Sequence, residues 1–208
     1  MESVLFPILI TMAAVGTGLA VRMREAQRQT RETARMVEAE RIVALLSNRQ
    51  PGVWDQDELR SRVQQTARDF WTAPTREALA GLAQWVGPEL LASAREAWPS
   101  ASVKRESTVA FEGRVAFMHV SEGGEPADRL IARLVAKRET RWLDANGKAI
   151  KHDRPRTVAT FHTWIHIDGQ GWQLTAIAEA MPPSEPPPSS VSCRILPQPA
   201  SEPLEHNP

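Results

Sequence analysis

The sequence predicts an α+β protein in which helices come first and an antiparallel sheet follows. Apolar residues recur at helical spacing as far as Pro99, and beyond it they alternate with a period of two. Near the end, the pair Asp168-Gly169 separates two runs rich in β-branched and aromatic residues, which is a strong hairpin signal. We therefore expect about three helices packed on a bent sheet of about four antiparallel strands.

Composition narrows the function classes. The chain has 208 residues with 25 basic and 25 acidic side chains, so its net charge gives no argument for binding nucleic acid. Its single cysteine, Cys193, forms no internal disulfide, which agrees with a reducing compartment. The sequence has no tyrosine, no Gly-rich phosphate loop and no nucleophile elbow. We expect neither a metal nor a cofactor.

Residues 1–21 are predicted to form a transmembrane anchor. Val4 to Val21 is a run of 18 residues without charge, at the lower limit for a helix that crosses a bilayer. A cleaved signal peptide is the alternative, but it requires positive charge ahead of the apolar run, and here Met1-Glu2-Ser3 precedes it. We expect an uncleaved single-pass anchor in the inner (cytoplasmic) membrane.

Basic residues follow the anchor and predict its orientation. Between Arg22 and Arg35 there are five arginines and two glutamates. Because positive charge stays on the cytoplasmic side, we expect the amino terminus outside and the rest of the chain in the cytoplasm. Anionic lipid headgroups are attracted to such residues by about 1 kcal/mol each. The candidate headgroup contacts are Arg22, Arg24, Arg28 and Arg31. Alternatively, these arginines only set the topology.

Residues 22–53 are predicted to form a charged stalk helix and a linker. Met23 to Leu46 contains neither proline nor glycine and is rich in alanine, glutamate and arginine, which favours a helix that continues out of the membrane. Its charges are mixed, and only its far end is apolar. We expect a solvated helix that docks onto the rest of the protein at that end.

Residues 54–181 are predicted to form the folded domain, which begins with helices. Asp55 is a candidate helix cap, with Glu58 three residues on, as in a capping box. This first helix carries an apolar stripe and ends before a proline. A short second helix follows, and a third runs from Glu89 to Trp98.

Strands follow the helices. The first predicted strand presents these residues on one face: Val109, Phe111, Val115 and Phe117. A turn with Gly123-Gly124 leads to an alternating run that continues toward Trp142. Asp144 to Gly147 then predicts a hairpin turn. We interpret Lys148 to Pro155 as a lead-in to the last hairpin.

The last hairpin runs from Arg156 to Ala180. Its first strand has mixed residues on both faces. One face carries Val158, Thr160, His162, Trp164 and His166, and the other Ala159, Phe161, Thr163, Ile165 and Ile167. Because neither face is simply polar, we expect this hairpin to be covered on one side and to line something on the other. Residues 182–208 are rich in proline, and we expect a disordered tail there.

Several of these features occur together in one known family. They are an anchor, a charged stalk, the helical run Leu59-x-x-x-Val63-x-x-x-x-x-x-Phe70-Trp71, Pro88-Glu89-Leu90, and the hairpin Phe161-His-Thr-Trp164-Ile-His-Ile with Trp172-Gln-Leu174-Thr-Ala-Ile177. Over roughly residues 55–180 the chain resembles the Tim forty-four-like domain family, named after the scaffold subunit of the mitochondrial inner-membrane import motor, which has bacterial relatives. The resemblance implies a nuclear-transport-factor-two-like cone, a curved sheet wrapped around helices with a hydrophobic pocket. It also implies a membrane-attached adaptor that binds a protein partner or lipid, rather than a catalyst.

We predict which residues line that pocket. The candidates are Phe161 and Trp164 from the sheet, with Phe70 and Trp85 from the helices. Each of these side chains could equally belong to the core. Binding would then come from burial of an apolar segment or an acyl chain, at about 25 cal/mol per Å² of apolar area before entropy costs.

Two other functions stay open. The same cone hosts isomerases and dehydratases, but ketosteroid-isomerase-like sites use a tyrosine, which this chain lacks. His162 and His166 would lie ~13 Å apart along a strand, too far to hold one metal together. A VirB-type secretion component carries its cone outside the cytoplasm, which disagrees with the arginines after the anchor. We therefore expect a non-catalytic adaptor in inner-membrane protein transport or assembly.

Overall fold

Helices precede strands along the chain, as the sequence predicts. The structure is a computed structural model that describes residues 5–122 and 128–182, with side chains described from residue 22 onward. The helices in these residues are α1 (Leu5–Arg49), α2 (Pro51–Trp54), α3 (Gln56–Thr72), α4 (Arg76–Ala80) and α5 (Pro88–Glu96). The strands are β1 (Lys104–Phe111), β2 (Ala116–Ser121), β3 (Asp128–Leu143), β4 (Ala149–Ile167) and β5 (Gly171–Ala178).

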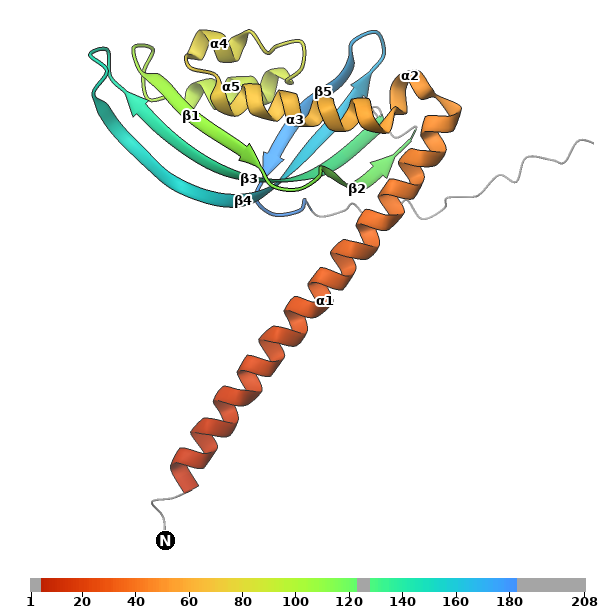
Figure 1. Cartoon of the computed structure of the whole chain (residues 1–208), viewed down its shortest axis with the longest axis vertical. Coiled ribbons are helices and arrows are strands. Elements are labelled where there is room, and N and C mark those ends of the chain that lie inside the picture. The colour runs from red at the N-terminus through yellow and green to blue at the C-terminus, as the bar shows by residue number, and fades with distance from the viewer. Residues whose placement is uncertain (1–4, 123–127, 183–208) are drawn as a thin grey trace, which may run out of the picture.

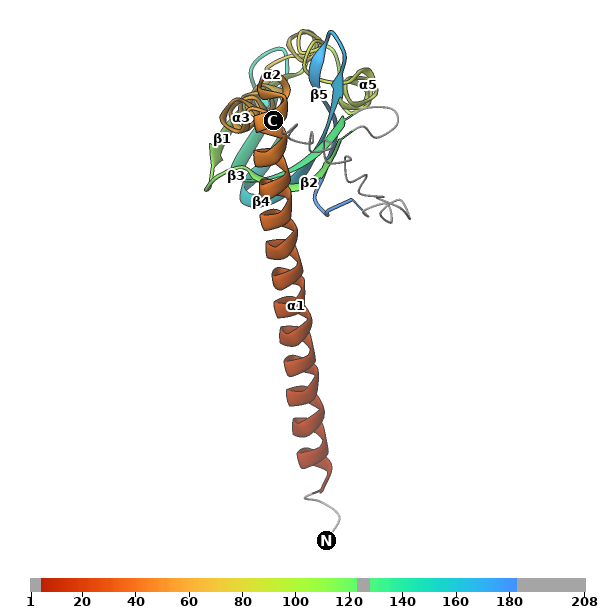
Figure 2. The ribbon, with the colours of Figure 1, turned by 90° about the vertical axis from the view of Figure 1, so that its right-hand side faces the viewer.

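The first helix is one continuous rod that projects from the folded head, which comprises α2 to β5 (Figures 1 and 2). It has 45 residues, so it is about 68 Å long at 1.5 Å per residue. The predicted anchor, residues 1–21, lies outside the residues whose side chains are described. In the described part of the chain, no helix is both long enough and apolar enough to cross a bilayer. The predicted Pro-rich tail likewise lies outside the described residues.

The far end of α1 is built into the head, which confirms and extends the predicted docking. Ala39, Val43 and Leu46 are buried in the main core. Glu40 adds polar contacts, since it forms an ion pair with the buried Arg60 and accepts a hydrogen bond from the backbone N–H of Phe117 at 3.3 Å. The last turns of the stalk are therefore structural parts of the head.

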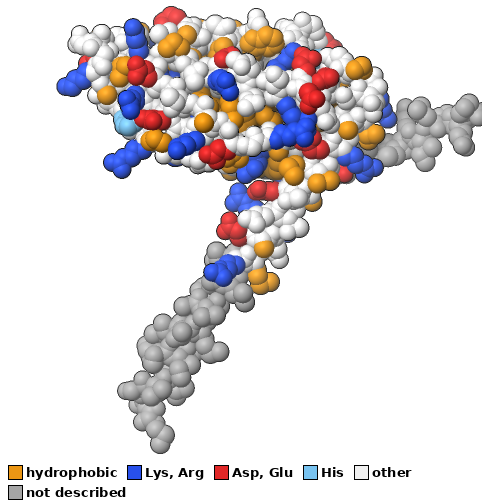
Figure 3. Space-filling view, in the orientation of Figure 1, with side chains coloured by type: hydrophobic (Ala, Val, Ile, Leu, Met, Phe, Trp, Pro, Cys, Tyr) orange, Lys and Arg blue, Asp and Glu red, His pale blue; other side chains and the backbone are white. Residues whose placement is uncertain are grey.

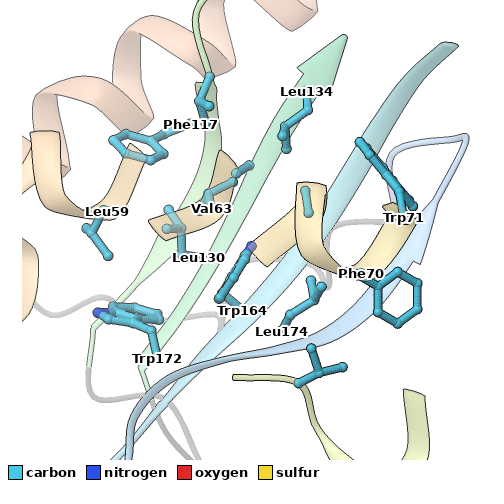
Figure 4. Close-up of a cluster of buried hydrophobic side chains, with 14 of the residues drawn as sticks. Leu59, Val63, Phe70, Trp71, Phe117, Leu130, Leu134, Trp164, Trp172 and Leu174 are labelled. Atoms are coloured by element: carbon cyan, nitrogen blue, oxygen red, sulfur yellow. The ribbon is translucent and has the colours of Figure 1, made fainter. Parts of the chain in front are cut away.

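Helix α3 forms as the capping pattern predicts. The Asp55 side chain accepts a hydrogen bond from the backbone N–H of Glu58 at 2.8 Å. The predicted apolar stripe is buried: Leu59, Val63, Thr66, Ala67 and Phe70. This stripe packs onto the concave face of the sheet, with Trp164 and Leu174 beneath it (Figure 4). Helices α4 and α5 extend the same layer (Figure 1).

The sheet is antiparallel with the order β1-β3-β4-β5, and β2 also pairs with β3. The single strand predicted from Val109 to Phe117 is wrong, because the chain forms two strands there, β1 and β2. Both lie along the same edge of β3, with Phe111 opposite Ala136 and Ala116 opposite Arg133. The break contains Gly113 with a φ of 76°, a backbone conformation that glycine adopts without strain.

Strand β4 is longer than the sequence predicts. The segment Lys148 to Pro155, interpreted as a lead-in, belongs to β4 from Ala149 onward. A proline has no N–H for the ladder and is tolerated in a strand at a bulge or an edge. Here the register of β4 on β3 shifts between the pairs of Arg138 and Thr140, which brackets Pro155.

The free edge of β5 is partly covered by the segment between α4 and α5. Gly87 donates its backbone N–H to the carbonyl of Leu174 at 2.8 Å, and Leu174 donates to the carbonyl of Trp85 at 2.8 Å. Two residues earlier in β5, the indole Nε1 of Trp172 donates to the carbonyl of Val53 at 2.8 Å. These contacts fix the predicted closing hairpin against the helices.

Candidate functional site

The four predicted pocket residues do not gather at one place. Trp164 is 1% exposed, and Phe70 is also buried in the core between α3 and the sheet (Figure 4). Trp85 is half-buried at the margin of that core. Phe161, 3% exposed, belongs to a separate cluster with Met118 and Ile131. In the described residues these side chains pack against protein, and their role in binding stays a prediction.

The cluster around Phe161 lies on the convex face of the sheet. Successive strand residues point to opposite faces, so Phe161 faces away from the core that holds Trp164. Met36 of α1 and Met181 pack against this cluster, and Arg35 Nη1 lies 3.2 Å from the Met181 sulfur. Both faces of the last hairpin are thus buried at its centre, whereas the sequence predicted that one face would line something.

Three of the four predicted headgroup contacts share one face of α1. Arg24, Arg28 and Arg31 border a hollow of about 440 Å³ between the stalk and the segment that leaves β5. Arg35 and Met181 close its upper end. Arg22 is exposed outside this hollow. Because Arg28 also pairs with Glu32 at 3.0 Å in an exposed site, that pair contributes little to stability.

At the carboxyl end of α3, arginine side chains pack against aromatic rings. The Arg105 guanidinium lies 4.8 Å from the Trp98 ring centroid and donates to the carbonyls of Ala73 at 3.0 Å and Phe70 at 2.6 Å. These are carbonyls at the carboxyl end of α3, so Arg105 caps the helix. Burial, helped by the charge of Arg138, lowers the pKa of Arg105 to about 10. The sequence contained no signal for this pairing, because it joins residues more than 30 positions apart.

Arg138 of β3 makes a second contact between an arginine and an aromatic ring. Its guanidinium lies 4.5 Å from the Trp71 ring centroid, a cation–π distance. Burial is the main cause that lowers the pKa of Arg138, and the charge of Arg156 adds to it. Arg138 therefore places its guanidinium against the ring of Trp71 and also lines a hollow on the sheet.

His162 is fully buried between these cations and α3. Its Nε2 lies 3.1 Å from the Thr160 hydroxyl, and its ring packs edge-on against Trp71 at 5.3 Å. Its Nδ1 has no hydrogen-bond partner among the described residues. Burial and the charge of Arg138 lower the pKa of His162 to about 3. In the described chain, no group of three or more His, Cys, Asp or Glu side chains is placed to hold a metal ion.

We predict that His162 makes the head less stable in acid. In the unfolded chain its pKa is about 6.5, and in the folded head it is about 3. Between these values only the unfolded chain binds the proton, so stability falls as the pH drops, by about 1.4 kcal/mol per unit at most. His162→Gln should flatten the dependence of the free energy of unfolding on pH between about 6.5 and 3. An unchanged slope would show that His162 titrates normally.

A further surface lies at the end of the sheet where β4 extends beyond β5. We call it the distal ribbon, and it comprises residues 137–143 of β3 and 149–157 of β4. A hollow of about 770 Å³ lies on it, lined by Arg138, Thr140, Lys151, His152, Asp153, Arg154, Pro155 and Arg156. Every β4 residue from Ala149 to Thr157 is exposed. This surface was not predicted from the sequence, because an exposed strand has no burial pattern. The density of basic residues between Lys148 and Arg156 was the available signal.

Comparisons with known proteins add little. No family model matches the chain, and no curated protein matches it. Among solved structures, the chain is similar to one described as the intermembrane space region of the chloroplast protein ARC6, with a TM-score of 0.43 and 12% sequence identity. The match covers 59% of this chain and 93% of that chain. A likeness at this level bears on neither fold nor function.

Proposed function

We propose that this protein is a membrane-tethered adaptor that presents its head to a partner protein near the bilayer. The observation that carries the proposal is that α1 is continuous and that its far end, at Val43, is buried in the head. A head fused to a helix in this way cannot swing freely. From Arg22 to Ala39, the first buried residue among the described side chains of α1, the helix spans about 25 Å.

The sequence of α1 supports the membrane side of the proposal. The uncharged run from Val4 to Val21 has the length of a bilayer span. The exposed arginines that follow, Arg24, Arg28 and Arg31, lie on one side of the helix, where they can meet anionic headgroups. The resemblance to the Tim forty-four-like family favours a role in inner-membrane protein transport or assembly.

We expect the partner protein to bind an exposed surface of the head. The aromatic side chains predicted to line a pocket, Trp164 above all, are packed among core residues. A partner therefore binds most directly to side chains that are already exposed. The distal ribbon and the hollow beside α1 are two such surfaces with concentrated charge among the described residues.

Crosslinking in intact membranes tests this function. The full chain should sediment with membranes and crosslink to a specific protein, whereas a variant that lacks residues 1–21 should be soluble and lose that crosslink. Far-UV circular dichroism of the shortened variant should show a folded head, because the first buried residue described is Ala39. If the shortened variant stays on membranes, or recovers the same partner equally well, the tethered-adaptor function is wrong.

A further inference from the structure

Among the described residues, the distal ribbon has an open strand edge. Strand β5 pairs with β4 from Phe161 to Ile167, and β3 occupies the other side of β4. In the described residues, no strand lies on the outer side of β4 between Ala149 and Thr160. Such an edge presents alternate unpaired backbone N–H and C=O groups, over about 40 Å for twelve residues, and is a template for another strand.

The ribbon is basic although the whole chain is neutral. Residues 137–143 and 149–157 contain six Lys and Arg side chains and two Asp and Glu side chains. Some of these charges are already paired, for example Lys151 with Asp153 at 3.4 Å and Arg156 with Glu179 at 3.0 Å. Among the described residues, Arg154 has no ion pair. Figure 3 shows Lys and Arg side chains at this end of the head.

The open strand edge and the excess of basic side chains together indicate which kind of molecule binds there. A second copy of the ribbon would bring like charges together, which disfavours pairing of two β4 edges. A nucleic acid or a membrane would use the charges but not the backbone groups of the edge. An extended acidic polypeptide uses both features, and Ile150, 53% exposed, adds an apolar contact.

We propose that the distal ribbon is the docking site for an acidic, extended segment of a partner protein, which adds a strand to the open edge of β4. Main-chain hydrogen bonds hold the segment, and its carboxylates lie against the cations of the hollow, Lys151, Arg154 and Arg156. This proposal rests on the adaptor function, for which it names the partner chemistry.

A binding experiment in nanodiscs tests the proposal. The full chain is placed in nanodiscs of uncharged lipid, and binding of a fluorescent peptide of alternating glutamate and valine is measured by anisotropy. The double variant Lys151→Glu, Arg154→Glu should bind at least roughly tenfold more weakly. The matched control is Arg95→Glu on α5, which changes an exposed arginine without an ion pair in the described chain and should leave binding unchanged.

Two further readouts separate strand addition from simple charge attraction. The same peptide with alternate backbone nitrogens methylated keeps its charge but loses its donors, so it should bind at least roughly tenfold more weakly. Amide hydrogen exchange of residues 149–160 should slow when the unmodified peptide binds. Both variants should keep the unfolding temperature of the native chain, because the substituted side chains are exposed.

The proposal is overturned if the methylated peptide binds as well as the unmodified one, or if a lysine–valine peptide does. Tighter binding of duplex DNA, or of anionic vesicles, would also overturn it. Co-elution of the chain with the nanodisc reports on the tether separately. Loss of peptide binding with co-elution retained would overturn the docking site alone. Peptide binding without co-elution would contradict the membrane tether alone.

Discussion

Replacing Trp164 with alanine is expected to lower the free energy of unfolding of the head by about 3–5 kcal/mol. Trp164 is 1% exposed and lies at the centre of the core, under α3 and beside Leu174 (Figure 4). The substitution leaves a cavity that rigid neighbours fill only in part. Denaturation of residues 22–208 by urea, followed by circular dichroism, measures the loss.

Two matched variants show what Trp164 contributes. Its Nε1 is buried without a hydrogen-bond partner among the described residues, so the ring stabilises by apolar contact. Trp164→Phe should therefore cost clearly less than Trp164→Ala. Trp85→Ala, at the margin of the core, should also cost less. If Trp164→Ala leaves stability unchanged but removes partner binding, Trp164 lines a pocket after all.

Replacing Val43 with aspartate is expected to destabilise the head by more than about 4 kcal/mol, because it buries an unpaired charge. Val43 is 0% exposed, although it belongs to the stalk helix in sequence. Val37→Asp is the matched control on the same helix, where the side chain is 60% exposed. It should change stability by less than about 0.5 kcal/mol. Equal effects at the two positions would show that α1 does not share the core.

The sequence predicted best where a local pattern has one physical outcome. The Asp55 cap, the α3 stripe and the Asp168-Gly169 turn each depend on neighbours in the chain, and each is confirmed. The docking of α1 was visible because Val43 and its neighbours are the apolar end of a charged helix. These signals fix the type of element and the face that it buries.

The features that the sequence did not predict depend on contacts between residues that are distant in the chain. A period of two spans β1 and β2 without interruption, and only their pairing with β3 shows that Gly113 separates them. The alternation also placed Phe161 and Trp164 on opposite faces of β4, yet it could not show that Met36 and Met181 cover the outer face. Phe161 and Trp164, one from each face, were therefore both candidates for lining a pocket. The distal ribbon was missed because an exposed strand is not recognisable from apolar alternation.

The proposed adaptor function requires that the stalk and the head move as one body. Pulsed dipolar spectroscopy measures this with spin labels at Gln29→Cys on α1 and Thr108→Cys on β1, both exposed, in a full chain with Cys193→Ser in nanodiscs. We expect one narrow distance distribution, because the last turns of α1 are packed into the core at Val43. A broad distribution in the folded protein would mean that the head swings on its stalk, and it would contradict the proposed fixed adaptor.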